Sequence, residues 1–372
     1  MNKSGDVNCV GIISSRSMSV LSIYAGPTAY QRLQQEGFNP DLFKVLLGAS
    51  GGPKWFVLYG LDRYLFAEYF AGRSDKLLTL GSSAGAWRLS CLATADPLRA
   101  IDTLARLYSE QTYSATPTIA EITEKMRHML VEVLGPDGPN SIVNNTVFQT
   151  HIVADRCKGI GNAQSKPLQA AFLAMSAAAN ALSRRNLSRF YQRSIFTSQL
   201  TQCPWRELDD LDTQVVALSQ ENVIDAMLAS GSIPFLLEGV RNIAGAREGM
   251  YWDGGITDYH FDMPFYPDDG LVLYPHFGAK VIPGWFDKHL PWRKPHASNF
   301  SNVVIIAPSP QFVAELPNGK IPDRTDFERY SEAERLQIWS EVLERSKLLA
   351  IEFQQLVERG AGIEEMQLLT HP

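Results

Sequence analysis

Apolar and polar positions in the first part of the chain alternate between the period of a strand and the period of a helix. Three short apolar runs, each followed at once by a glycine, are typical of buried strands that open into turns. They span residues 19–25, 43–47 and 76–80. The segments after them carry apolar side chains at helical spacing, at residues 28–36, 54–70 and 84–95. Strands that alternate with helices favour a parallel sheet covered on both faces, which binds ligands at the carboxyl ends of its strands.

The next stretch, about residues 98–190, has a mainly helical pattern. Thr118 and Glu121 form a capping box ahead of an apolar helix face, and residues 168–182 form an Ala-rich helix. A strand is predicted between them, at residues 147–154. We therefore expect a helical insertion in the alternating pattern.

The remaining chain returns to a mixed pattern and closes with a long helix. Its predicted elements are strands at residues 213–218, 250–252, 271–274 and 302–307 and a helix at residues 223–228. Residues 311–324 have the composition of a loop. Ser331 and Glu334 form a second capping box, and the apolar stripe after it predicts one long helix that ends at Gly360. No repeat or linker divides the chain, so we expect one α/β domain over most of it.

Composition argues against several classes of protein. The formal charge is −6, from 34 Lys and Arg against 40 Asp and Glu, which argues against a nucleic-acid partner. Hydrophobic residues make up 45% and charged residues 20%, the balance of a globular chain. No apolar stretch reaches the length of a membrane-spanning helix, and Asp6 and Arg16 do not fit a signal peptide. We therefore expect a soluble, cytoplasmic protein.

The cysteines agree with that expectation, because they are scattered without C-x-x-C pairs or metal-site spacing. They are Cys9, Cys91, Cys157 and Cys203. We expect small, buried, reduced side chains in a reducing compartment, and no metal or other cofactor.

Glycines number 27, an ordinary total, but they gather in clusters. Residues 81–85 read Gly-Ser-Ser-Ala-Gly between a predicted strand and a predicted helix, which is the context of a nucleophile elbow. Gly81 and Gly85 leave room for neighbouring backbone at a strained turn. The turn lifts the Ser83 hydroxyl to the N-terminus of the helix, where free N–H groups stabilise negative charge.

A second cluster fits the same motif. Residues 48–52 read Gly-Ala-Ser-Gly-Gly after another apolar run, which makes Ser50 a second candidate nucleophile. A phosphate-binding P-loop does not fit this stretch, because that motif needs Gly-Lys-Ser or Gly-Lys-Thr and here Lys54 lies between Pro53 and Trp55. The motif alone leaves two serines open.

A third cluster places a carboxylate beside two glycines. Asp253 ends an apolar run and is followed by Gly254 and Gly255. Glycines here let the backbone pass close to another element, so Asp253 can approach a serine directly. The ordinary alternative is an Asp-Gly turn with no chemical role.

Taken in this order, the clusters resemble the patatin-like phospholipases, or lipid acyl hydrolases. That family has a glycine-rich oxyanion loop, then G-x-S-x-G on a strand-to-helix turn, then Asp-Gly-Gly or Asp-Gly-Ala far downstream. Residues 50–54, Ser-Gly-Gly-Pro-Lys, resemble the loop, and residues 229–234, Ala-Ser-Gly-Ser-Ile-Pro, resemble the block that precedes the family's aspartate. The resemblance covers about residues 18–275. It departs from the family at Lys54, where arginine is usual, and at Trp55, where glycine is usual.

The resemblance implies a patatin-like three-layer α/β/α fold and a serine hydrolase that cleaves acyl esters of lipids, as a phospholipase A, lysophospholipase or carboxylesterase. It makes Ser83 the nucleophile and Asp253 the general base and acid. The oxyanion hole then consists of the backbone N–H groups of Gly51, Gly52 and Ala84, and water releases the acyl-enzyme. The supporting motif positions are Gly81, Gly85, Lys54, Gly254 and Gly255.

The same resemblance implies a domain organisation. Residues 1–310 form the catalytic domain, with the core motifs in residues 18–275 and the helical insertion at about residues 98–190. Residues 311–372 form a loop and a long helix that pack on this core. The sequence carries no expectation for the oligomeric state.

Three alternatives stay open. An α/β-hydrolase carries a Ser-Asp-His triad in that chain order, and His260 and His276 both follow Asp253. Ser50 can replace Ser83 as the nucleophile. A hydrolase fold that binds lipid without turnover is the non-enzyme alternative.

Two stretches that mix cationic and aromatic side chains suit peripheral contact with an anionic membrane surface. The first is residues 184–193, with four arginines around Phe190 and Tyr191, and the second is residues 285–294, with Trp285 and others. The ordinary interpretation of each is a solvated basic face beside packing aromatics. We expect a lipid or other acyl-ester substrate in either case.

Overall fold

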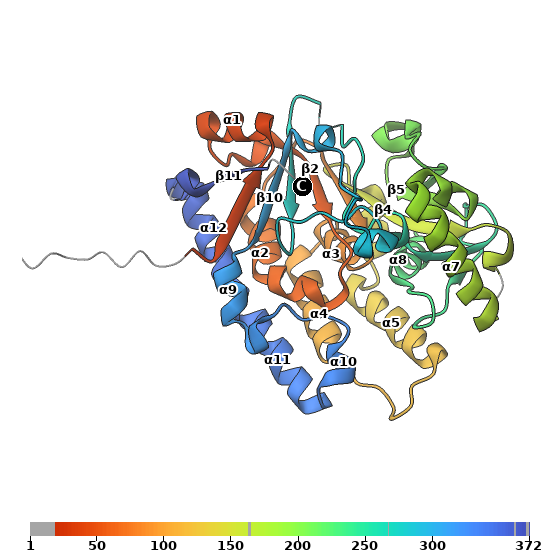
Figure 1. Ribbon diagram of the computed structural model, residues 1–372. Helices are drawn as coiled ribbons and strands as arrows, with labels where there is room; N and C mark the ends of the chain where they lie inside the picture. The colour runs from red at the N-terminus through yellow and green to blue at the C-terminus, as the bar shows by residue number, and fades with distance from the viewer. Residues whose placement is uncertain (1–18, 163–164, 267, 361, 370–371) are drawn as a thin grey trace, which may run out of the picture.

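The computed structural model describes residues 19–162, 165–266, 268–360, 362–369 and 372. The strands are β1 (Leu21–Ala25), β2 (Phe43–Gly48), β3 (Leu77–Ser82), β4 (Phe148–Cys157), β5 (Tyr191–Thr197), β6 (Thr213–Ala217), β7 (Val240–Arg241), β8 (Met250–Asp253), β9 (Leu271–Pro275), β10 (Val303–Pro308) and β11 (Gln367–Leu368). They form a mixed, mostly parallel sheet in the order β11-β1-β10-β9-β2-β3-β4-β5-β6 (Figure 1). In addition, β8 pairs with β4, and β7 pairs with β8.

Helices flank this sheet, so the predicted α/β/α class with a mostly parallel central sheet is confirmed (Figure 1). The helices are α1 (Pro27–Glu36), α2 (Tyr59–Tyr64), α3 (Ala84–Leu92), α4 (Pro97–Ser109), α5 (Ile119–Leu134), α6 (Gly138–Asn144), α7 (Lys166–Leu182), α8 (Val223–Gly231), α9 (Pro310–Glu315), α10 (Asp326–Arg329), α11 (Glu332–Arg345) and α12 (Lys347–Arg359). Among the described residues, no helix has both the length and the apolar character that crossing a membrane requires.

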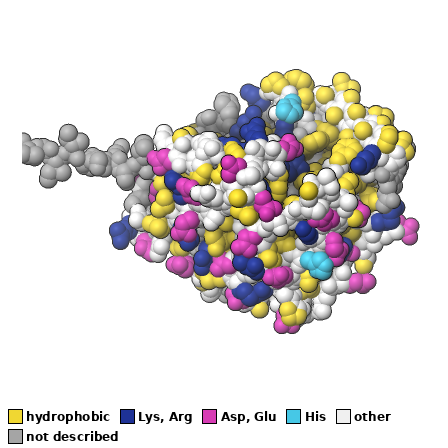
Figure 2. Space-filling view, turned by 90° about the horizontal axis from the view of Figure 1, so that it is seen from below, with side chains coloured by type: hydrophobic (Ala, Val, Ile, Leu, Met, Phe, Trp, Pro, Cys, Tyr) yellow, Lys and Arg dark blue, Asp and Glu magenta, His cyan; other side chains and the backbone are white. Residues whose placement is uncertain are grey.

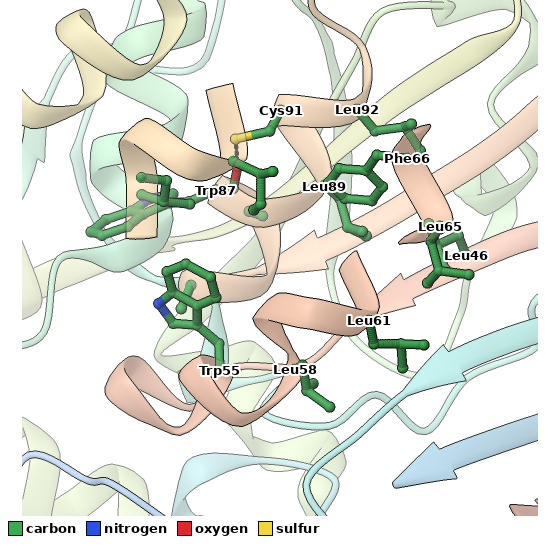
Figure 3. Close-up of a cluster of buried hydrophobic side chains, with 14 of the residues drawn as sticks. Leu46, Trp55, Leu58, Leu61, Leu65, Phe66, Trp87, Leu89, Cys91 and Leu92 are labelled. Atoms are coloured by element: carbon green, nitrogen blue, oxygen red, sulfur yellow. Dashed lines mark hydrogen bonds between the residues drawn. The ribbon is translucent and has the colours of Figure 1, made fainter. Parts of the chain in front are cut away.

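Both faces of the sheet are buried, which explains why its strands have continuous apolar sequences. In β10, Val304 belongs to the main hydrophobic core and its neighbour Val303 to a second cluster, as a period of two requires. The main core includes side chains of α2, α3 and α12, and Figure 3 shows its part around α2 and α3. Trp55 is fully buried there, so it anchors the glycine-rich segment that precedes it.

Cys91 also lies in this core, where its thiol donates to the carbonyl oxygen of Trp87. Cys91, Cys157 and Cys203 are buried and unpaired, as predicted. Cys9 and the N-terminal segment for which no signal peptide was expected lie outside the described residues.

The two longest predicted helices are each interrupted, and they contact each other at Gly60 and Ser346. Residues 54–70 form a 3-10 helix (Gly52–Leu58), then α2, then one π-helical turn (Leu65–Tyr69). The single helix predicted after Ser331 is two helices, α11 and α12, which join at Ser346. The joint at Ser346 packs closely against α2, since a Cβ on Gly60 would lie 2.5 Å from the Ser346 carbonyl oxygen. The Ser346 hydroxyl accepts a hydrogen bond from the Gly60 N–H at 2.9 Å.

Other predictions need correction. Residues 311–324, predicted as a loop, include most of α9 and a short 3-10 turn (Pro317–Gly319). Strand β5 was not predicted, and it contains the end of the stretch interpreted as a basic face. Arg193 in β5 is fully buried and its Nε lies 2.6 Å from Asp258, so it belongs to the interior. The predicted domain limits, with a boundary near residue 310, stay a prediction.

Candidate active site

Strand pairing brings the predicted nucleophile and aspartate together. Strand β3 runs parallel to β4 and ends with Ser82 opposite Val153. Strand β8 runs antiparallel to β4 and ends with Asp253 opposite Ala154, the next residue along. The carboxyl ends of β3 and β8 therefore meet at neighbouring residues of β4, Val153 and Ala154. This arrangement places Ser83 and Asp253 side by side although they are far apart in the sequence.

A tight turn between β3 and α3 holds the serine. Ser83 has φ 55° and ψ −132°, a strained conformation for a side chain other than glycine. The two glycines of the motif allow it, because other backbone passes directly against the turn. A Cβ on Gly85 would lie 2.0 Å from the Gly48 carbonyl oxygen, and one on Gly81 would lie 2.5 Å from the Ala86 Cα. Glycine is therefore required where β2 crosses the start of α3.

The Ser83 hydroxyl donates a hydrogen bond of 2.8 Å to Oδ2 of Asp253. Oδ1 of the same carboxylate accepts the N–H of Gly255 at 2.7 Å. Burial raises the pKa of Asp253 to about 6, against the opposing effects of these two donors. Gly254 allows the approach, since a Cβ there would lie 2.2 Å from the Val153 carbonyl oxygen. The arrangement is a serine hydroxyl hydrogen-bonded directly to a buried carboxylate whose pKa is raised.

Residues 229–234 support both members of this pair. The Ser230 hydroxyl accepts the N–H of Ser83 at 2.9 Å and donates to the Val153 carbonyl oxygen at 2.6 Å. The Ser232 carbonyl oxygen accepts the N–H of Asp253 at 2.8 Å. Sequence reasoning noticed this block only as a family resemblance and assigned it no role. Its roles depend on strand ends that no local pattern reveals.

The glycine-rich segment after β2 lies beside the serine turn. Gly48 pairs with Gly81, so the two G-x-S-x-G motifs lie in register on neighbouring parallel strands. The Ser50 hydroxyl, however, donates to the Ser82 hydroxyl at 3.0 Å and not to a carboxylate. Its own N–H is held by the Tyr259 carbonyl oxygen at 2.9 Å. The geometry therefore distinguishes the two candidate serines.

Backbone donors are available at this place. Gly51 and Gly52 line the cavity in front of Ser83, and Ala84 is the first residue of α3. Within the described residues, the N–H groups of Gly51, Gly52 and Ala84 have no protein acceptor. Lys54, which replaces the arginine usual in the family, lies one turn further on and also lines the cavity. These positions are as the sequence predicted, and their role stays a prediction.

The two candidate histidines face each other and not the serine. Their rings lie 4.3 Å apart, and both are almost fully buried. His260 Nδ1 accepts the N–H of Ile282, and His276 Nδ1 lies 2.6 Å from the Gly278 carbonyl oxygen. Burial lowers the pKa of His276 to about 4 and that of His260 well below its usual value. Neither histidine is hydrogen-bonded to Ser83 or Asp253 in the described structure.

The serine and aspartate open into a cavity of about 400 Å³. One wall is apolar and is formed by Leu173, Ile233, Pro234, Phe235, Ile256 and Trp285. The other wall is polar and includes the glycine-rich segment and three cationic side chains. The described residues contain no cluster of His, Cys, Asp and Glu side chains with the spacing of a metal site.

Comparison with known proteins agrees with this geometry. Residues 78–261 match the family model of the patatin-like phospholipases, and this part of the chain is therefore a patatin-like phospholipase domain. The match includes the serine turn, residues 229–234 and Asp253, whereas the segment at residues 50–54 lies outside it. The resemblance stated from the sequence is confirmed.

Among solved structures, VipD from Legionella pneumophila is similar to this chain at 15% sequence identity and a TM-score of 0.32. The alignment covers 73% of this chain and 56% of that chain. No curated protein matches the sequence.

Proposed function

We propose that the protein is a serine esterase of lipids that works through a dyad of Ser83 and Asp253. The hydrogen bond of 2.8 Å between the Ser83 hydroxyl and the Asp253 carboxylate carries this proposal. A nucleophile needs a base within hydrogen-bond reach, and the apolar wall of the cavity suits an acyl chain. The substrate class is then an ester with a long apolar acyl group, as in a phospholipid, a lysophospholipid or another lipid ester.

The proposed reaction has two halves. Asp253 takes the hydroxyl proton while Ser83 Oγ forms a bond to the ester carbonyl carbon, and the N–H groups of Gly51, Gly52 and Ala84 hold the oxyanion. The alcohol then leaves as its C–O bond breaks, and protonated Asp253 gives it the proton. In the second half Asp253 deprotonates a water that attacks the acyl-enzyme, and the fatty acid leaves while Ser83 regains its proton.

The pH dependence of turnover follows from the raised pKa of Asp253. The base must be ionised to act, so kcat/KM for a neutral soluble ester is expected to rise with pH around a midpoint of about 6. The rise is measured with a short-chain ester between pH 4.5 and pH 8. A profile that is already flat above pH 5 would argue that a group with a lower pKa is the base, such as His276 with its pKa of about 4.

A triad of the α/β-hydrolase type is the less favoured second candidate. It needs a histidine between serine and aspartate, whereas here the Ser83 hydroxyl bonds the carboxylate directly. The site of His260 and His276 also disfavours the charged imidazolium that such a mechanism requires, because burial lowers the pKa of both.

We also propose that the protein contacts a lipid surface through an apolar rim around the cavity mouth. Hydrophobic side chains gather at the upper right of Figure 2, on the side where α7 lies in Figure 1. The exposed members of the rim are Leu168, Met175 and Leu182 of α7, with Trp285 and Trp292. Leu182 is 86% and Trp292 64% exposed. Such exposure costs free energy in water, and an interfacial helix recovers it in a bilayer.

One hydrogen bond joins the two parts of the rim, and each part has a side chain in the cavity wall. The Asn180 side chain of α7 donates to Asp287 at 2.7 Å, which ties the helix to the 3-10 turn Trp285–His289. Leu173 of α7 and Trp285 both line the cavity. The exposed cations Arg185, Arg189 and Lys294 follow the rim in sequence and suit anionic lipid.

The rim is tested by vesicle binding. Leu182→Glu together with Trp292→Ala is expected to lower binding to phosphatidylglycerol-containing vesicles about tenfold or more, because each side chain contributes about 1.5–3 kcal/mol when buried. Sedimentation of the vesicles measures the fraction of protein that is bound. The matched control is Ile351→Glu on α12, 51% exposed and at the other end of the sheet (Figure 1). Equal binding by wild type and the rim variant, or an equal loss in the control, contradicts the proposal.

A further inference from the structure

Three cationic side chains line the polar wall of the cavity, and the proposed reaction uses none of them. Lys54, Lys288 and Arg324 all line it, and they come from three separate parts of the chain. Lys54 lies in the 3-10 helix after β2, Lys288 in the turn Trp285–His289, and Arg324 in the loop before α10. Among the described residues, none of these three side chains forms an ion pair or a side-chain hydrogen bond with a carboxylate.

The carboxylates of the cavity wall do not neutralise them. The carboxylates among the lining residues are Asp253 and Asp323. Asp253 is occupied by Ser83 and Gly255, as described. Asp323 is occupied by its own loop, because it accepts the Thr325 hydroxyl at 2.6 Å and pairs with Lys320 at 3.1 Å. Within the described residues, the three cations therefore have no carboxylate at ion-pair distance, and Asp253 and Asp323 attract them only at longer range.

The loop that carries Arg324 is tied to the core through Asp326. Asp326 is fully buried and pairs with Lys320 at 2.6 Å, and it accepts the indole N–H of Trp339 at 2.9 Å. A Cβ on Gly52 would lie 3.5 Å from Cγ of Arg324, which shows that this side chain passes against the glycine-rich segment. Arg324 is exposed, but its aliphatic stem passes against Gly52 and the residue lines the cavity, so its guanidinium is available to a bound ligand.

Both lysines have a lowered pKa, which means that the cavity disfavours their charged forms. Lys288 Nζ lies 3.9 Å from the centre of the Tyr259 ring, in place of a carboxylate partner. Burial, with nearby Lys54 and Arg324, lowers the pKa of Lys288 to about 8. Burial also lowers the pKa of Lys54. An anion in the cavity would restore both lysines toward their usual pKa and remove the mutual repulsion of the three cations.

We propose that Lys54, Lys288 and Arg324 form a binding site for an anionic group of the substrate that lies close to the ester bond. The group is a phosphodiester or a carboxylate, since both are acceptors that an arginine fork and two ammonium groups recognise. The inference rests on the proposed esterase function and narrows its substrate class to anionic acyl esters. A neutral ester leaves the three cations without a partner in the cavity, so it is the poorer substrate.

The test compares matched esters in neutral mixed micelles at pH 7. The phosphodiester arm pairs myristoyl lysophosphatidylglycerol with neutral monomyristoylglycerol, and the carboxylate arm pairs the myristoyl ester of glycolic acid with its methyl ester. The readout is the ratio of kcat/KM for the anionic ester to kcat/KM for its neutral partner. We expect a ratio of about 10 or more in the wild type for at least one arm. The arm with the larger ratio identifies the source of the anion.

Charge-removing variants locate the site. Arg324→Gln and Lys288→Gln are each expected to lower the ratio about tenfold, and Arg324→Lys to lower it less. Raising the NaCl concentration from 50 to 500 mM is expected to lower the wild-type ratio as well. The matched control is Lys76→Gln, which removes an exposed charge just before β3, at the other end of that strand from Ser83. A ratio near 1 in the wild type, or a ratio unchanged by both variants, overturns the proposal.

A binding measurement separates failure of this site from failure of the esterase proposal. Calorimetry with Ser83→Ala gives the affinity for the same anionic and neutral lipids without turnover. If the wild type hydrolyses no ester, the esterase proposal fails, and the anion site stands only if Ser83→Ala prefers the anionic lipid and loses that preference with Arg324→Gln. If esters are hydrolysed but neither turnover nor affinity depends on the anion, the anion site alone fails.

Discussion

Replacement of Ser83 by alanine is expected to reduce kcat for ester hydrolysis by roughly 10⁴-fold or more, and Asp253→Asn by roughly 10³-fold. The first change removes the atom that forms the acyl-enzyme. The second keeps the shape of the side chain but removes a base whose raised pKa lets it accept the Ser83 proton. Initial rates with a chain-length panel of esters measure both, with circular dichroism to confirm the fold.

Two controls separate the dyad from its rivals. Ser50→Ala removes a hydroxyl that bonds only Ser82, and His276→Gln changes a ring that bonds the Gly278 carbonyl oxygen. Both are expected to change kcat by less than about tenfold. A loss at His276 as large as that at Ser83, in a protein that remains folded, contradicts the dyad and favours a triad. If no ester is hydrolysed while lipid binding is retained, the chain is a binding module.

Loss of Asp258 is expected to lower the free energy of unfolding by about 3–5 kcal/mol. Its carboxylate binds Arg193 through Nε at 2.6 Å and Nη2 at 3.0 Å, and Arg184 through Nη2 at 3.0 Å. Asp258 and Arg193 are both fully buried. Asp258→Ala leaves the Arg193 guanidinium in the interior with Asp210 as its remaining carboxylate partner. Urea unfolding at pH 7 measures the change.

The matched control for this variant removes an exposed ion pair. Asp75 pairs with Lys44 at 3.3 Å, and its side chain is 65% exposed, so Asp75→Ala is expected to cost less than about 1 kcal/mol. If Asp258→Ala costs no more than the control, the buried network does not stabilise the fold. Asp258 also lies five residues after Asp253, and Thr257 between them donates to Asp155 at 2.8 Å. The network therefore fixes the position of the segment that follows Asp253.

The parts of the site that depend on local sterics were predictable. Glycine at 81 and 85 is forced by contacts that a Cβ cannot make, and such positions leave a readable pattern in the sequence. The pairing of Ser83 with Asp253 was predictable only through the family resemblance, because it depends on two strands that share one edge of β4.

The parts that depend on distant partners were not predictable. Strand β5 was missed because Arg193 gives it a polar pattern, and its partner Asp258 lies 65 residues away. The same holds for Lys288 and Arg324, whose surroundings in the sequence indicate nothing about a shared cavity. The joint of α11 and α12 at Ser346 is hydrogen-bonded to Gly60, a contact that no helical pattern near Ser346 indicates.

The most direct test of the central claim is covalent labelling with an active-site phosphonate ester, followed by peptide mapping. The account predicts that the wild-type protein carries the label on Ser83, and that Asp253→Asn lowers the labelling rate because the base is lost. Label on Ser50 in the wild type, or labelling of Ser83→Ala at the wild-type rate, contradicts the assignment of Ser83 as the nucleophile.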